Sequence, residues 1–310
     1  MFIFNPLFTI FILLLGGYMA KNIGVLKQKQ SKMFLDFAIL FALPCLIFDK
    51  TYHLNFDFTL VTLILIGFLS CILSAGFAVM LGRFLQFSKA TLVSMFLLAG
   101  FGNTLFIGIP ILSGIYGESF ISEAIFYDAL ATAIPISIIG PFILSLASNQ
   151  PTNFLSNLKR ILLFPPFIAL ILGFVCKLFV LPDFIFQPLI IFGNSATAVA
   201  LFSIGLGLGF SAIKSSYKGT IIVVLSKTLL APLIFVVILS LLDIAFTPRV
   251  IAAILESSMP TMTLAGAMIM KAKLDSNLAV SSIAFGILFS FVSIPLLCYL
   301  LPISTQNSKN

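Results

Sequence analysis

Charge is what this sequence has least of. Asp, Glu, Lys and Arg make up 9% of its 310 residues, whereas 60% are hydrophobic and the mean hydropathy is +1.21. Soluble domains carry about a quarter charged residues, so this composition excludes a soluble globular domain and indicates an integral membrane protein. The net charge is +7, but the basic residues are not clustered on any one segment. They are interpreted as topology signals, and no nucleic-acid partner is expected.

Chemically reactive residues are equally scarce. His53 is the single histidine of the sequence, and four cysteines lie in separate apolar runs without CxxC or metal-ligand spacing: Cys45, Cys71, Cys176 and Cys298. We expect them to be small buried side chains, and we expect no metal site. HExxH and Walker motifs are absent, and no histidine lies near a candidate nucleophile. The sequence therefore predicts neither an enzyme nor a cofactor, and no direct use of ATP by this chain.

Long apolar runs dominate the chain. About 20 apolar residues are needed to cross a hydrocarbon core of roughly 30 Å as a helix. The first run has no basic start and is long enough to span, so it is interpreted as a helix and not as a cleaved signal peptide. Reading for such runs predicts ten transmembrane helices, at residues 3–20, 33–53, 58–82, 90–114, 121–147, 161–181, 185–211, 219–242, 250–270 and 277–301.

The basic residues predict the orientation of these helices. Twelve lie in the loops after predicted helices 1, 3, 5, 7 and 9: Lys21, Lys27, Lys29, Lys32, Arg83, Lys89, Lys159, Arg160, Lys214, Lys218, Lys271 and Lys273. The opposite face holds Lys50, Lys177, Arg249 and Lys309. By the positive-inside rule the first face is cytoplasmic, so both termini are predicted outside a plasma (inner) membrane.

Ten helices with a cytoplasmic loop at the middle divide into five plus five. An odd number per half makes the second half insert upside down relative to the first, as in inverted-repeat transporters. We therefore predict a first repeat over residues 1–147, a cytoplasmic linker over 148–160, a second repeat over 161–301 and a short outer tail over 302–310. The linker contains SNQPTNFLSN, which is rich in Asn, Ser and Pro.

The fourth run is too long for one straight crossing. Residues 90–117 contain no charged residue, and 28 helical residues would extend roughly 42 Å against a core of about 30 Å. Inside it lies GNTLFIGIP (102–110), where glycines and Pro110 favour unwinding and Asn103 and Thr104 offer polar groups. The ninth run repeats this pattern in ESSMPTMT (256–263), with Pro260 near its middle and Thr261 beside it.

Unwound backbone at membrane depth is tolerated where protein buries it or where it lines a watery cavity. Two interruptions at matching places of inverted halves favour a binding site between them, although a pair of simple kinks is the alternative. Half-helix ends present N–H groups to an anion and carbonyls to a cation. The fold class predicted is therefore all-α and integral to the membrane, with broken, crossing helices 4 and 9.

GNTLFIGIP and ESSMPTMTLAGAMIMKAKLD resemble the helix-4 and helix-9 motifs of the auxin efflux carrier family. LLFPPFIALILG (162–173) and SATAVALFSIGLGL (195–208) are similar to its sixth and seventh helices. The resemblance implies ten helices, an inverted repeat, two broken helices that cross at their prolines, and a scaffold of helices 1, 2, 6 and 7 that can form a homodimer. The long central loop of plant members is absent, so the chain resembles the short prokaryotic branch, which implies a bacterial-type carrier of carboxylates.

Two charges lie deep in predicted helices. Lys227 follows Lys218 by nine residues and Glu256 follows Arg249 by seven, so they lie about 14 Å and 10 Å from opposite faces and at depths only about 6 Å apart. A lone charge there costs about 3 kcal/mol or more, so each should face a partner or water. Lys227 could balance substrate charge while Glu256 couples a proton, or the two could form a structural pair.

Two further polar residues have two interpretations each. Asp128 lies about 8 Å from the outer face and could serve the site or be hydrated at the interface. Asn194, in helix 7, could bind substrate or glue helices together. The IGLGLG run (204–209) is interpreted as close helix packing, because it follows no strand and is not a nucleotide loop.

The function predicted is a secondary transporter of small organic anions, with possible coupling to protons or sodium. A ten-helix drug/metabolite exporter and a sodium-coupled bile-acid-type symporter are alternatives within transport. A channel is the alternative from another class, which saturable flux and counterflow would exclude.

Overall fold

The structure is a computed structural model that describes residues 4–54, 58–147, 162–209 and 213–301, together with Leu155, Leu158 and Lys159. The described residues form helices joined by turns, with one isolated antiparallel bridge between Gly102 and Thr261. Most of the predicted linker 148–160, and the whole tail 302–310, lie outside the described residues.

The chain folds as two compact units, and each takes segments from both halves of the sequence. Unit 1 consists of Met1–Phe56, Ile109–Phe126 and Leu158–Leu208. Its elements are α1 (Phe4–Asn22), η1 (Gln28–Gln30), α2 (Ser31–Phe37), η2 (Ala38–Ala42), α3 (Leu43–Tyr52), α6 (Ile109–Tyr116), α7 (Phe120–Tyr127, whose last residue is assigned to unit 2), α10 (Pro165–Cys176), η5 (Asp183–Ile185) and α11 (Phe186–Gly207). Unit 1 thus contains the helices that the resemblance implies as a scaffold.

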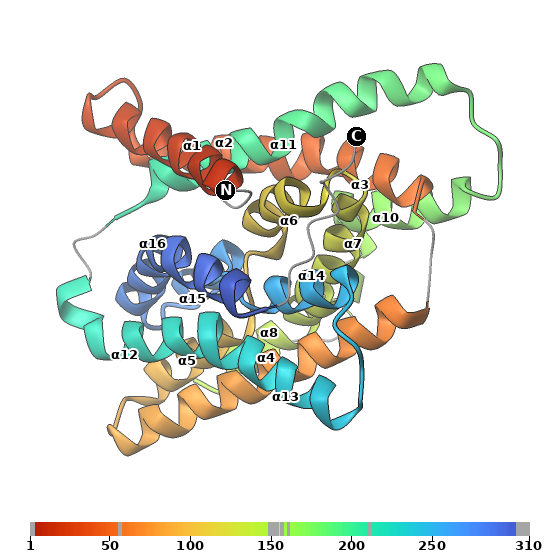
Figure 1. The fold of residues 1–310 in the computed structure, drawn as a ribbon. Helices are drawn as coiled ribbons and strands as arrows, with labels where there is room; N and C mark the ends of the chain where they lie inside the picture. Colours follow the sequence, from red (N-terminus) through yellow and green to blue (C-terminus); the bar gives the residue numbers. More distant parts are fainter. Residues whose placement is uncertain are drawn as a thin grey trace. The chain divides into compact units, whose positions relative to one another are not determined.

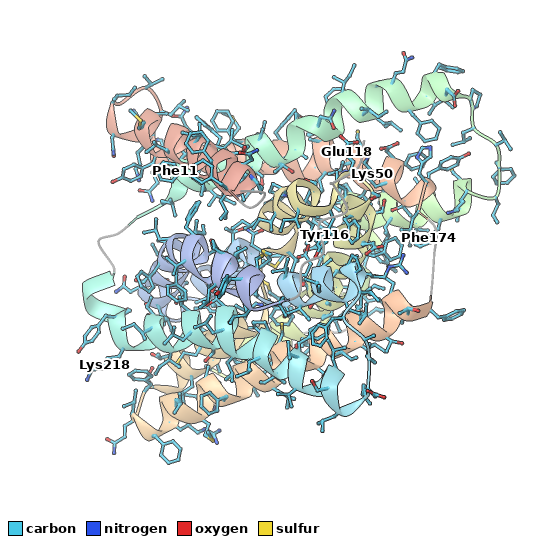
Figure 2. The ribbon with its side chains drawn as sticks, viewed as in Figure 1. Phe11, Lys50, Tyr116, Glu118, Phe174 and Lys218 are labelled. Atoms are coloured by element: carbon cyan, nitrogen blue, oxygen red, sulfur yellow. The ribbon has the colours of Figure 1, made fainter. Side chains whose placement is uncertain are left out.

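Unit 2 consists of Asp57–Gly108, Tyr127–Asn157 and Gly209–Asn310. Its elements are α4 (Phe58–Phe84), α5 (Lys89–Gly100), η3 (Thr104–Gly108), η4 (Asp128–Ala133), α8 (Ile134–Ser145), α12 (Ile213–Leu225), η6 (Ser226–Leu230), α13 (Ala231–Leu241), α14 (Pro248–Ser257), α15 (Thr263–Lys271) and α16 (Ser276–Leu300). Within this unit α4 packs on α5, α13 and α14, and α16 packs on α12 and α15 (Figure 1). Lys218 is an exposed residue of α12 (Figure 2).

Seven helical stretches within the described residues are long and apolar enough to cross a membrane. Three of the ten predicted spans are shorter. The fourth is divided into 89–100 and 104–116, the sixth is the 12-residue helix α10, and the ninth is divided into α14 and α15. The protein is therefore an all-helical, multi-pass membrane protein, and ten crossings stay a prediction.

Close helix contacts in unit 1 rest on glycine. A Cβ built on Gly205 would overlap the backbone of Leu14, and one on Gly17 would overlap the backbone of Phe202, so α1 and α11 pack backbone to backbone. Small residues allow this approach between membrane helices. The IGLGLG run thus packs closely, as expected. Elsewhere in the unit, the ring of Phe174 of α10, which is labelled in Figure 2, packs edge to face on the ring of Phe126 of α7. The two ring centroids lie 5.1 Å apart.

Side-chain caps begin three of the helices in unit 2. Ser88 accepts a hydrogen bond from the Thr91 amide at 3.2 Å at the start of α5, and Thr247 accepts one from Val250 at 3.3 Å at the start of α14. Asp275 does the same for α16, at 3.0 Å from the Leu278 amide. Each cap satisfies a backbone N–H that has no partner within its own helix, which fixes where these helices begin.

The described part of the chain contains four π-helical segments, η2, η3, η4 and η6. Each is followed by a proline at the second position of the next helix: Pro44, Pro110, Pro135 and Pro232. The residue before the proline donates to the carbonyl five residues earlier in three of them, as Ile134 does to Ala129. Proline lacks an N–H and its ring displaces the carbonyl four residues earlier, which favours the wider turn. These prolines therefore widen their helices without ending them.

Candidate functional site: the crossover in unit 2

The site is built on two places in unit 2 where helices stop and extended backbone takes over. After Gly100, the last residue of α5, Phe101 is extended (φ −124°, ψ 122°), and helical structure resumes at Thr104. Similarly, α14 ends at Ser257 and α15 begins at Thr263. Both predicted interruptions are therefore present, each inside a largely apolar run of the sequence.

The two interrupted segments satisfy each other's backbone groups. The Asn103 amide donates to the Pro260 carbonyl at 2.7 Å, and the Met262 amide donates to the Phe101 carbonyl at 2.9 Å. These bonds flank the antiparallel bridge between Gly102 and Thr261. Unpaired backbone groups are costly in a membrane, so this mutual pairing is what allows two helices to open at the same place. We call residues 101–103 and 258–262 the crossover.

Asn103 is the most buried amide side chain at the crossover, with 3% of its surface exposed. Its Oδ1 accepts a hydrogen bond from the Phe106 amide at 3.3 Å, which orients the side chain at the start of η3. Its Nδ2 has no hydrogen-bond acceptor among the described residues. A buried donor without an acceptor is costly and uncommon, so this nitrogen fits a site for an acceptor group of a ligand.

Thr104 links the crossover to the neighbouring helix. Its hydroxyl donates to Asp128 Oδ1 at 2.6 Å and lies 3.4 Å from the Thr132 hydroxyl. Thr104 and Asp128 are the first residues of η3 and η4, and both are buried. Asp128 therefore lies among the buried polar side chains around the crossover, which we call the polar cluster, and not at a hydrated interface.

Lys227 and Glu256 are both 1% exposed. Lys227 Nζ donates to the Ser257 carbonyl, at the last residue of α14, and lies 3.5 Å from Cys71 Sγ. Both carboxylate oxygens of Glu256 lack a hydrogen-bond partner among the described residues. Among the described residues, therefore, Lys227 and Glu256 form no direct ion pair. The sequence predicts similar membrane depths for Lys227 and Glu256, but in the structure their side chains have different surroundings.

Two glycines make room for these charged side chains. A Cβ on Gly102 would lie 2.8 Å from Lys227 Cε and 2.9 Å from the Met259 carbonyl oxygen. A Cβ on Gly108 would overlap the Glu256 carboxylate. The glycines of the 102–110 motif thus serve close approach of charged groups as well as backbone freedom.

Seven of the nine predicted site residues lie in unit 2: Asn103, Thr104, Asp128, Lys227, Glu256, Pro260 and Thr261. The other two belong to unit 1, where Pro110 lies within α6 and Asn194 is exposed on α11. The crossover involves Pro260 but not Pro110, because the fourth span opens at residues 101–103 and Pro110 follows a π segment. The implied crossing at two prolines therefore involves one.

Three residues of the cluster were missed by sequence reasoning. Cys71 was expected to be an apolar filler, yet its sulfur lies beside Lys227 and 3.7 Å from the Ser257 carbonyl. Tyr127 is buried, and its hydroxyl has no hydrogen-bond partner among the described residues. Ser257 lies inside the ESSMPTMT motif, but it contributes a backbone carbonyl, which side-chain chemistry does not mark. Prolines 135 and 232 were an available signal, since they place wide turns at Asp128 and Lys227.

Over the described part of the chain, no group of three or more His, Cys, Asp or Glu side chains is placed to hold a metal ion. The polar groups at and around the crossover are instead the Asn103 amide, hydroxyl groups, the Asp128 and Glu256 carboxylates and the Lys227 ammonium. Such a set can bind a small polar molecule or ion by hydrogen bonds and charge.

The chain is similar to known membrane transport proteins. The chain matches the family described as membrane transport protein over residues 2–153 and 148–298. It is 27% identical over 294 residues to an uncharacterized transporter of Methanothermobacter thermautotrophicus, with 93% of this chain and 95% of the relative covered. An uncharacterized transporter of Methanocaldococcus jannaschii is 27% identical over 297 residues, with the same shares.

A mouse protein described as lysosomal cholesterol signaling protein is 26% identical over 268 residues, which is 78% of this chain and 30% of the relative. Two family matches that together span nearly the whole sequence, and relatives aligned almost end to end, establish the family. The chain is a multi-pass membrane transporter and belongs to the membrane transport protein family, that of the auxin efflux carriers.

Proposed function

We propose that this transporter moves small organic anions, carboxylates in particular, by alternating access, with the substrate held at the crossover of unit 2. The observation that carries the proposal is the buried Asn103 Nδ2, a donor without an acceptor, placed where two helices open. A carboxylate oxygen is the acceptor that would complete it, because charge-assisted hydrogen bonds are the strong ones.

The start of α15 adds a second feature that favours an anion. Met262, the residue before this helix, provides no side-chain cap. The first N–H groups of a helix carry partial positive charge and bind anions in transporters of this kind. Lys227 supplies a full positive charge within the same cluster, which lowers the cost of bringing an anion into the membrane.

Two carboxylates near the crossover support a proton as the coupling ion. Glu256 and Asp128 are both buried in unit 2. With both ionised they would repel an anionic substrate, so a proton taken up by Glu256, whose oxygens have no partner, would allow the anion to enter. We therefore propose uptake or release of the anion together with a proton.

The architecture proposed is ten helices in a five-plus-five inverted repeat, in a plasma membrane with both termini outside. Support comes from the two interruptions, which lie in predicted helices 4 and 9, and from the two family matches, which divide the chain near residues 148–153. The two compact units provide separate bodies for alternating access.

The test is uptake into liposomes that contain the purified protein, screened over small mono- and dicarboxylates with imposed proton and sodium gradients in turn. We expect saturable, counterflow-positive uptake driven by the proton gradient. Asn103→Ala should reduce uptake by at least 10-fold, since a substrate hydrogen bond and the Phe106 cap are lost. Asn277→Ala removes an exposed amide in α16 of the same unit and should leave uptake unchanged.

Other outcomes would contradict the proposal in different ways. Uptake that depends on a sodium gradient would favour a sodium-coupled symporter, and single-channel currents would favour a channel. If wild type takes up carboxylates and the Asn103→Ala variant does so at the same rate, the crossover is not the substrate site.

A further inference from the structure

The C-terminal end of α14 is buried, and its last carbonyls must find partners inside the protein. The Leu255 carbonyl accepts from the Ser258 amide at 3.0 Å, and the Glu256 carbonyl accepts from the Met259 amide at 3.2 Å. The carbonyl of Ser257, the last helical residue, accepts from Lys227 Nζ. The end of this half-helix is therefore satisfied by a charged side chain from η6.

A helix end of this kind is a natural place for a cation. The C-terminus of a helix carries about half a negative charge, and half-helix C-termini inside membranes coordinate sodium ions or protons. Lys227 Nζ presents a compact positive charge with three donors at that place. Cys71 Sγ lies 3.5 Å from it, and Gly102 packs against Cε with space for nothing larger than hydrogen.

The corresponding end of α5 differs. Its Leu98 carbonyl accepts from the Thr261 hydroxyl at 3.1 Å, and the Phe101 carbonyl accepts from the Met262 amide. Neutral donors satisfy this end. The charged partner at α14 is thus not a general need of the crossover but a property of one side of it.

We propose that the Lys227 ammonium takes the place of a coupling cation at the C-terminal end of α14, so that this site needs no sodium. Removal of the side chain should then leave a site for a small monovalent cation, formed by the Ser257 carbonyl, Cys71 Sγ and the space beside Gly102. The statement about coupling rests on the proposed function, whereas the cation site can be tested without any substrate.

The experiment is thermal unfolding of the purified full-length protein in detergent, in choline, sodium, methylammonium or ethylammonium chloride at equal ionic strength. Lys227→Ala should unfold at a lower temperature than wild type in choline. Ethylammonium or methylammonium should raise its Tm by roughly 2–5 °C, as a ligand at several times its Kd would do. Wild type should show no rise with any of these cations, because its own ammonium fills the site.

Two variants are matched controls. Lys177→Ala removes a lysine of unit 1 that also donates to a backbone carbonyl, that of Leu54, and its Tm should not respond to small ammonium ions. Lys227→Met fills the space without charge, so it should be destabilised yet insensitive to added cation. A general stabilising effect of ammonium salts would appear in all variants and would contradict a site at Lys227.

Failure of this inference differs from failure of the proposed function. A folded Lys227→Ala protein whose Tm ignores sodium and both alkylammonium ions overturns it, even if wild type transports carboxylates. If the variant cannot be purified, wild type still decides: a Tm or a carboxylate uptake that rises specifically with sodium overturns it, and identical values in sodium and choline support it. A wild type that moves no carboxylate but meets the Tm expectations contradicts the proposed function alone.

Discussion

The two interruptions in unit 2 have the same backbone pattern and different chemistry. Each places a helix end against extended backbone of the other, through the bridge between Gly102 and Thr261. In the fourth span the preceding helix end is completed by a threonine hydroxyl, and the following one by Asn103. In the ninth span the preceding end is completed by Lys227, and the following one has no side-chain cap.

This difference shows that pairing of backbone and placement of charge are separate properties of a crossover. Backbone groups freed where a helix opens inside a membrane need partners, from protein or from water in a cavity. The charged donor Lys227 completes the helix end of the ninth span, whereas neutral donors complete the helix end of the fourth span, where Asp128 joins Thr104. A bound anion would thus meet an uncapped helix start and an amide donor, while the cation of the cluster stays fixed to protein.

The largest effect expected from breaking this asymmetry comes from Lys227→Met. It leaves the Ser257 carbonyl without its ammonium donor and removes a buried positive charge while Glu256 stays. A buried carbonyl that loses a charged donor costs more than the about 1–3 kcal/mol of a lost neutral one, so the Tm in detergent should fall markedly. The double variant Lys227→Met/Glu256→Gln removes both charges and should recover part of that loss. A change of about 1 °C is within the error of a Tm measurement. A Lys227→Met protein whose Tm differs from wild type by no more than that would contradict the role assigned to the lysine.

Gly102→Ala should have the next largest effect, because its Cβ would lie 2.8 Å from Lys227 Cε and 2.9 Å from the Met259 carbonyl oxygen. Overpacking of this kind costs about 1–3 kcal/mol. Gly100→Ala is the matched control two residues earlier. There the new Cβ meets only side-chain atoms, at 3.4 Å from Ala75 Cβ and 3.8 Å from Ile72 Cδ1. Equal unfolding temperatures for the two variants would show that Lys227 is not held against Gly102.

A smaller loss is expected for Thr261→Val, which keeps the side-chain shape but removes the donor to the Leu98 carbonyl. Loss of one neutral hydrogen bond to a buried carbonyl costs about 1–3 kcal/mol. The Tm should therefore fall by less than for Lys227→Met. The reverse order would mean that the neutral end of α5, and not the charged end of α14, is the more demanding side.

The smallest effect on stability is expected for Glu256→Gln, since neither carboxylate oxygen has a hydrogen-bond partner to lose among the described residues. Its Tm should stay close to that of wild type, whereas carboxylate uptake should lose its response to an imposed proton gradient. Liposome uptake at several external pH values would measure this. Glu123→Gln, at a half-buried position of α7 in unit 1, provides a comparison, and uptake by it should still follow the gradient.

Much of the crossover could be predicted from residues 102–110 and 256–263, because glycine, proline and polar residues inside an uncharged run are hard to reconcile with a continuous helix. The position of each interruption was less predictable. Pro110 follows a π turn and leaves the helix intact, whereas Gly100 is the last residue of α5. Proline chemistry permits either result, and the choice depends on which neighbouring segment can take over the freed backbone groups.

Lys227 shows where depth along the membrane normal stops being informative. Counting residues from flanking charges places Lys227 and Glu256 at similar depths, which permits a pair as one of two interpretations. Depth says nothing about rotation around a helix axis, and the runs are too uniformly apolar for their periodicity to supply it. The side chains consequently found different partners, a backbone carbonyl of α14 for the lysine and close approach to Gly108 for the glutamate.

By itself the sequence determined that this protein lies in a membrane and is helical. It also determined the family motifs and the two stretches where helices open. Those properties follow from local composition, because hydropathy and the chemistry of glycine and proline act within a single segment. Only the tertiary structure decided that Thr261 and Lys227 complete opposite helix ends, that Asp128 joins Thr104, and that Pro110 and Asn194 belong to the other unit. These outcomes depend on which donors and acceptors from distant segments meet at one depth and one rotation, and no single segment encodes that meeting.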